Sequence, residues 1–218
     1  MKEDCYTKLH LVQKVEGSPK LPIQRKRSHL KLQPDLPYPL STPLSSSAPF
    51  GWMHSYCFEQ CQNQVGSSES AQEALLKLSK FLGEIFQADC CFIAASPSLS
   101  TCWLPNSPSP HLQQMLWGWF QQPVLKEQWI NDHLTIADIQ TLLPQEDFPF
   151  RSILAICTRH YGKFNGIICL MRAASQIPPG SPAQSWKKED LQLLKTLSPQ
   201  VSIAITQARL EQQAQQQI

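Results

Sequence analysis

The sequence contains no run of eighteen consecutive apolar residues, so it predicts no transmembrane helix. Its first residues, MKEDCYTKLH, lack the apolar stretch of a secretion signal. A glycine-rich phosphate loop, a Ser/His/Asp order and a His/Glu metal pair are also missing, so no common catalytic motif is present. His111, His133 and His160 fall in expected loops or beside an expected turn, where histidines are more often surface residues than bases. We therefore expect a protein that is not an enzyme.

Half of the eight cysteines lie inside apolar runs, namely Cys90, Cys91, Cys157 and Cys169. A reduced cysteine behaves as a small hydrophobic residue, whereas disulfides persist in oxidising compartments. This placement favours reduced thiols, and we expect a cytoplasmic localisation.

Proline, serine and basic residues are concentrated at the start of the chain. Residues 1–32 hold eight Lys or Arg and three acidic residues, which leaves 11 basic and 14 acidic residues for the rest. The composition predicts that residues 1–66 form a basic, Pro/Ser-rich tail, largely disordered, with a short helix at 51–65. The basic cluster 24–27 has no interleaved aromatic residues, which favours a solvated tail over binding to nucleic acid or to a membrane surface.

Three potential metal ligands lie close together in this predicted short helix. His54, Cys57 and Cys61 are spaced by three and four residues, so they would share one helical face. A structural zinc site usually takes four ligands from separate segments, and no second ligand cluster follows at a suitable spacing. The alternative is that the apolar residues of this helix pack it onto the domain, and we expect no bound metal.

The folded domain is predicted to begin near residue 67 with an amphipathic helix. Ser70 and Glu73 form a capping box at its start, and Gly83 lies inside it, where it would permit close packing. The apolar stripe of this helix consists of Ala71, Leu75, Leu78, Leu82 and Ile85. Later patterns predict strands at 90–95 and 99–104, a helix over 112–120 and short extended pieces between 129 and 139.

Two nearly all-apolar strands then form a predicted hairpin. The segment Tyr161–Phe164 places Gly162 first in a two-residue turn, which is the preference of a type II′ loop. This register pairs Ile156 with Cys169, so Cys157 and Cys169 would point to opposite faces of the sheet and would form no disulfide.

A loop over 173–185 separates this hairpin from the last helix, which we expect to begin at Trp186. Pro199 interrupts the helix, but the apolar pattern resumes in phase, so we expect a bend or a restart rather than an end. Residues 213–218 form a polar, Gln-rich end. The stripe of the helix consists of Leu194, Leu197, Val201, Ala204 and Ala208.

The pattern over residues 67–212 resembles a GAF domain, the small sensory module of signalling proteins. The likeness is carried by the segments Phe150–Ile156, Gly166–Leu170 and Asp190–Leu210. The resemblance implies an α+β fold with a central antiparallel sheet of five to six strands. It also implies that the N- and C-terminal helices pack together on one face of this sheet.

In this family a ligand cavity, when used, lies on the other face of the sheet, under the variable middle segment. The resemblance makes Trp117, Trp129, His133 and Asp138 candidate wall residues of such a cavity. The last helix of GAF domains usually continues into a coiled coil that feeds a histidine kinase or another output. We therefore expect a homodimer through the terminal helices and a histidine kinase or other signalling partner.

The ligand chemistries of known family members match this sequence poorly. The segment Ile136–Ile139 is similar to the one that carries the aspartate of phytochrome-like members. However, residues 140–150 hold neither the Cys nor the His of a covalent bilin site. The Asp-x-Cys-Phe signature of a second bilin cysteine matches at Asp89–Phe92. This match lies in the expected first strand, whereas the family carries the signature in a later loop. We expect no cofactor and no covalent bilin.

Two other family chemistries are equally poorly matched. The Asn-Lys pair of the cyclic-nucleotide members is missing. No cysteine between 103 and 156 matches the reactive cysteines of the free methionine-sulfoxide reductases. Two hypotheses stay open: a regulatory module that senses a small molecule, and a ligand-free module for dimerisation or protein interaction.

Overall fold

The computed structural model describes residues 50–105, 110–144, 148–173 and 186–217. Its helices are α2 (Phe50–Gly66), α3 (Ala71–Ile85), α4 (Pro110–Phe120), α5 (Pro123–Lys126) and α6 (Lys188–Gln215), and a 3-10 helix η2 spans Ile139–Thr141. Its strands are β1 (Cys90–Ser96), β2 (Leu99–Trp103), β3 (His133–Ile136), β4 (Phe150–His160) and β5 (Lys163–Ala173). The predicted tail over 1–49 and most of the predicted loop 173–185 lie outside the described residues.

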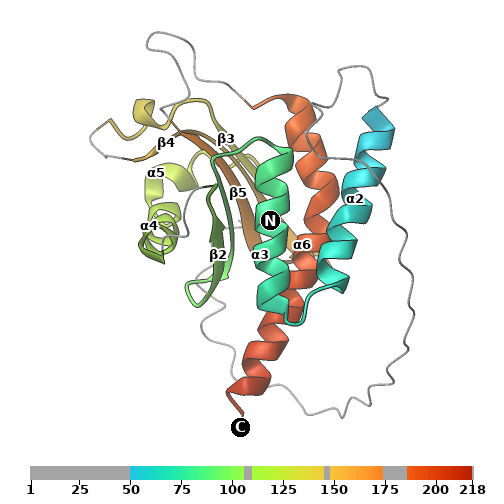
Figure 1. The fold of residues 1–218 in the computed structure, drawn as a ribbon. Helices are drawn as coiled ribbons and strands as arrows, with labels where there is room; N and C mark the ends of the chain where they lie inside the picture. Colours follow the sequence, from blue (N-terminus) through green and yellow to red (C-terminus); the bar gives the residue numbers. More distant parts are fainter. Residues whose placement is uncertain (1–49, 106–109, 145–147, 174–185, 218) are drawn as a thin grey trace.

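The five strands form one antiparallel sheet in the order β2-β1-β5-β4-β3. The inner strands β4 and β5 are covered on both faces, which explains why both are nearly continuous apolar runs. Helices α2, α3 and α6 pack together over one face, and α4 and α5 lie against the other (Figure 1). This arrangement confirms the predicted α+β fold with its terminal helices on one face.

Helix α3 begins at the predicted cap and packs closely on β2. Ser70 Oγ accepts a hydrogen bond from Glu73 N at 3.1 Å, and the Glu73 carboxylate accepts one from Glu69 N at 2.8 Å. Gly83 lets the Trp103 ring approach the helix, since a Cβ at this position would lie 2.1 Å from two ring carbons. The close packing predicted at Gly83 is confirmed.

The β4–β5 turn differs from the prediction. Tyr161 and Gly162 form the two-residue turn, and the pair His160–Lys163 closes it. Both turn residues have positive φ, 48° and 74°, which is the type I′ geometry. The predicted type II′ turn with Gly162 in first place is therefore wrong by one residue.

A bulge near this turn also changes the predicted register. Asn165 is an extra residue on β5, between the pairs Thr158–Gly166 and Arg159–Phe164. Beyond the bulge, Ile156 pairs with Ile168 rather than with Cys169. Cys157 and Cys169 consequently pack in the same apolar cluster, so their predicted placement on opposite faces is wrong. Both are free thiols.

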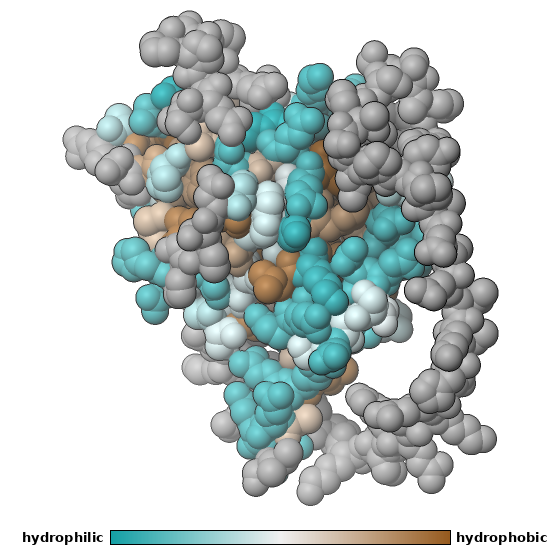
Figure 2. Space-filling model, viewed as in Figure 1, coloured by the Kyte–Doolittle hydropathy of each residue, from teal (hydrophilic) through white to brown (hydrophobic). Residues whose placement is uncertain are grey.

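Helix α6 continues through Pro199 as a single helix, and its predicted apolar stripe is buried. Proline has no N–H to donate to the Lys195 carbonyl one turn earlier. Ser198 Oγ donates to this carbonyl instead, at 3.0 Å. The helix begins at Lys188 rather than at Trp186, and hydrophilic residues cover its far end (Figure 2).

Helix α2 packs against both α3 and α6. The folded body therefore includes residues 50–66, which the sequence assigned to the tail with its short helix. Among the described residues, no helix combines the length and the apolar character that crossing a membrane requires.

Candidate functional site

The four predicted wall residues are divided between the two faces of the sheet. Trp117 in α4 and Trp129 after α5 pack, partly buried, against the apolar cluster on the α4 side. His133 in β3 is paired with Ile156 of β4, whose side chain packs on the α6 side. The side chain of His133 therefore faces α6, and the structure does not bring the four residues into one cavity.

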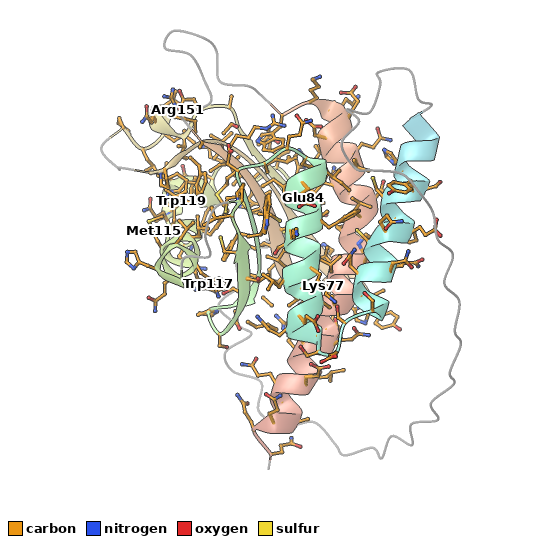
Figure 3. The ribbon with its side chains drawn as sticks, in the orientation of Figure 1. Lys77, Glu84, Met115, Trp117, Trp119 and Arg151 are labelled. Carbon is orange, nitrogen blue, oxygen red and sulfur yellow. The ribbon has the colours of Figure 1, made fainter. Side chains whose placement is uncertain are left out.

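Aromatic rings occupy the α4 side of the sheet. Trp119 stacks on Phe148 with ring centroids 4.4 Å apart, and Phe92 stacks on Phe120 at 6.1 Å. Figure 3 shows Trp117 and Trp119 on α4 beside the sheet. Trp119 Nε1 is buried and has no hydrogen-bond partner among the described residues. This side is therefore a packed apolar layer that contains an unused N–H donor.

Asp138 joins the start of β4 to η2. Its carboxylate accepts hydrogen bonds from Arg151 Nε at 2.8 Å and from Arg151 Nη2. It also accepts one from Gln140 N at 3.1 Å, which caps η2. The hydrogen bonds from the Arg151 guanidinium hold the pKa of Asp138 below its ordinary value. The visible role of Asp138 is to fix the segment after β3.

A pocket of about 370 Å³ opens between the edge of the sheet and α6. A tight turn before β3 forms one wall, where Ile130 N donates to the His133 carbonyl at 2.9 Å. The turn contributes Asn131, Asp132 and His133, strand β4 contributes Ile156, Cys157 and Arg159, and α6 contributes Lys195, Ser198 and Pro199. Of the four predicted wall residues, His133 lines this pocket.

The charged groups of this pocket do not all neutralise one another. Arg159 Nη2 lies 2.7 Å from Asp132 Oδ1, so these two form an ion pair. The exposed Lys195 ammonium has no ion-pair partner in the part of the chain that the structure describes. Burial and, to a smaller extent, Lys195 lower the pKa of His133. His133 is therefore mainly neutral at pH 7, and the pocket keeps the positive charge of Lys195.

Hydrogen bonds connect strands β4 and β5 with α6. Asn165, the bulge residue, donates from Nδ2 to the Ser202 carbonyl at 2.8 Å and accepts from Thr158 Oγ1 at 2.7 Å. Ser202 Oγ donates to the Arg159 carbonyl at 2.8 Å. The pocket residue Arg159 is thus hydrogen-bonded through its backbone carbonyl to Ser202 of α6, which lies three residues after Pro199.

The candidate metal ligands of α2 face the body of the protein. His54 Nδ1 lies 3.3 Å from Thr196 Oγ1, and Cys57 and Cys61 are buried in the apolar cluster. Burial raises the pKa of Cys57 to about 11 and the pKa of Cys61 to about 12. Within the described ranges, no three His, Cys, Asp or Glu residues are arranged to hold a metal ion.

Sequence reasoning named His133 but missed Arg159 and Lys195 as pocket residues. The available signal was Ser198-Pro199 inside an otherwise regular helical pattern, because a proline there removes a backbone hydrogen bond. Which strand edge lies beside that point of the helix depends on the pairing of β3 with β4.

Comparison with known proteins adds independent evidence on the family. A sequence model of the GAF domain matches residues 70–205, inside the predicted domain at 67–212. No curated protein sequence matches the chain.

Three solved structures are similar in fold. The GAF domain of an Acinetobacter phosphoenolpyruvate-protein phosphotransferase has a TM-score of 0.50 and 15% identity, over 72% of this chain and 95% of that one. Free methionine-R-sulfoxide reductase from Neisseria meningitidis has a TM-score of 0.50 and 14% identity, over 76% and 96%. The chromophore-binding domain of Stigmatella aurantiaca phytochrome P1 has a TM-score of 0.52 and 10% identity, over 74% and 62%.

These low identities show the fold and nothing of the ligand. The family match, by contrast, extends over more than half of the chain and includes all of α3, the whole sheet and the first part of α6. The chain therefore belongs to the GAF domain family.

Proposed function

We propose that this chain is a non-catalytic sensory or regulatory module of cytoplasmic, two-component-type signal transduction. It binds a small molecule in the pocket beside α6 and passes the change on through that helix. The observation that carries the proposal is that α6 itself supplies Lys195, Ser198 and Pro199 to the pocket. A ligand there touches the helix directly at the point where its backbone lacks a hydrogen bond.

The state of the thiols supports a non-catalytic role. Reactive cysteines need an accessible setting that lowers the thiol pKa. Burial instead raises the pKa of Cys91 and of Cys169 well above the ordinary value. Cys90 Sγ and Cys102 Sγ lie 3.3 Å apart inside the protein. This contact raises the pKa of Cys90 and lowers the pKa of Cys102, but both thiols are buried away from any substrate in solution.

The proposed partners follow from the position of α6. Its buried stripe fixes it to the sheet, and its polar end leaves the body, where it can meet a histidine kinase or another signalling protein. We further propose a homodimer through the terminal helices α3 and α6.

Native mass spectrometry of the full chain, purified from its own cells, tests the sensory proposal. We expect a small-molecule adduct that is lost on denaturation. The proposal would be contradicted if the chain carries no adduct and if a mixture of small metabolites leaves the hydrogen exchange of the α6 amides unchanged.

A second candidate function is a ligand-free dimerisation or interaction module. The supporting observation is that Ile203 and Leu210 are 38% and 60% exposed and lie seven residues apart on one stripe of α6. Size-exclusion chromatography with light scattering distinguishes the two functions: a dimer that never carries a ligand favours this second one.

A further inference from the structure

The pocket between β3, β4 and α6 presents hydrogen-bond donors above an apolar floor. Lys195 supplies an ammonium group, and His133 supplies an imidazole that faces α6. The buried Ile156 side chain forms the floor, and Pro199 adds an apolar edge. A ligand that fits has a polar head and a short apolar body.

The charges of the pocket select the sign of that head. Asp132 already neutralises Arg159 through their 2.7 Å contact, whereas Lys195 has no ion pair among the described residues. A cationic head would be repelled by the Lys195 ammonium. An anionic head would gain a charge-assisted hydrogen bond, which is roughly twice as strong as a neutral one.

The size of the pocket limits the ligand to a small metabolite. Its volume of about 370 Å³ lies near the lower end of the range for small-molecule sites. A single head group at Lys195 leaves room for a few carbon atoms over Ile156.

We infer that this pocket binds a small carboxylate with a short apolar body. The carboxylate is held by Lys195 and His133, and the body lies over Ile156. The inference rests on the proposed sensory function, since it names the ligand class of that sensor. The site also differs from the expected cavity on the α4 side, where aromatic rings are packed.

Titration of the ¹⁵N-labelled full chain with butyrate, followed by amide chemical shifts, tests this inference. Butanol and butylamine are the matched neutral and cationic probes, and inorganic phosphate tests the need for an apolar body. We expect saturable shifts at His133 and Ser198 with butyrate alone. Equal shifts with butylamine, or tighter binding of phosphate, would overturn the inference.

Two lysines of the same helix provide a matched pair of variants. Lys195→Ala is expected to weaken butyrate binding about tenfold, which corresponds to the loss of one charge-assisted contact. Lys188→Ala removes the same charge from the exposed first turn of α6 and is expected to leave affinity unchanged. Equal losses in both variants would mean diffuse attraction to a basic helix and would refute the site.

Asp132→Asn keeps the inference falsifiable if a lysine variant folds poorly. Removing this carboxylate takes away the negative charge of the pocket that neutralises Arg159, so butyrate should bind several-fold more tightly. Weaker binding would count against the inference.

The proposed function can fail or succeed independently of this inference, because it requires only that some small molecule binds in the pocket. A bound small molecule that is not a carboxylate would refute the proposed ligand class but would leave the proposed sensory function intact.

Discussion

Gly83 shows how one missing side chain fixes the distance between α3 and the sheet. A Cβ added at Gly83 would lie 2.1 Å from two carbons of the Trp103 ring. We predict that Gly83→Ala destabilises the protein by roughly 1–3 kcal/mol, because the ring must move out of a packed position. Urea unfolding measures this difference.

Gly118→Ala is the matched control, since Gly118 also lies inside a helix and has no atom within 4 Å of the added Cβ. This substitution should stabilise the protein by about 1 kcal/mol through helix propensity. Stabilisation by both substitutions would contradict the contact with Trp103.

The buried thiols Cys57 and Cys61 predict a loss of stability at alkaline pH. Their folded-state pKa values, about 11 and about 12, lie above the ordinary value of 9.0. A raised folded pKa gives stability that is complete below the unfolded pKa and is lost as pH rises through the folded pKa. The free energy of unfolding should therefore fall from about pH 9.0 upward, more steeply in the wild type than in Cys57→Ala/Cys61→Ala.

Chemical unfolding between pH 7 and pH 10.5 measures both slopes. Between pH 7 and about pH 7.5 the two proteins should show parallel curves, because thiols are almost fully protonated in both states there. Identical slopes above pH 9.0 would show that these thiols are not buried in solution.

At the scale of elements, α6 compensates for its proline through Ser198. We predict that Ser198→Ala costs about 1 kcal/mol, because it leaves the Lys195 carbonyl without its donor. Pro199→Ala restores an N–H for the same carbonyl and should stabilise the helix by up to ~3 kcal/mol. In the Pro199→Ala background, Ser198→Ala should cost almost nothing.

The double-mutant cycle from these three variants isolates the coupling between the two positions. Equal costs of Ser198→Ala in both backgrounds would show that the hydroxyl does not replace the missing N–H. Thermal or urea unfolding of the full chain gives all four free energies.

The accuracy of the sequence-based predictions differed between helices and strands for a physical reason. The stripes of α3 and α6 follow the helical period within one segment, so sequence spacing alone predicted most of the residues that these helices bury. The β4–β5 register depends on the bulge at Asn165, whose side chain is fixed by Ser202, 37 residues later. No local pattern around the turn reports that contact.

At the scale of the whole molecule, the fold and its layers were predictable, but the pocket was only partly so. His133 was identified as a candidate, yet its face depends on β3 pairing with β4, and its neighbours Arg159 and Lys195 come from two other elements. Trp117 and Trp129 were proposed as cavity walls and pack against the apolar cluster of the α4 side. Aromatic residues have the same sequence signature in a core and in a ligand site.

The central claim is that a ligand in the pocket acts on α6, and hydrogen exchange of the full chain tests it most directly. With saturating butyrate, we predict slower exchange at the α6 amides of residues 200–210, because a ligand at Lys195 orders the helix beside Pro199. The amides of residues 75–82 in α3 are the internal control and should not change. Bound butyrate with unchanged exchange throughout α6 would contradict the account.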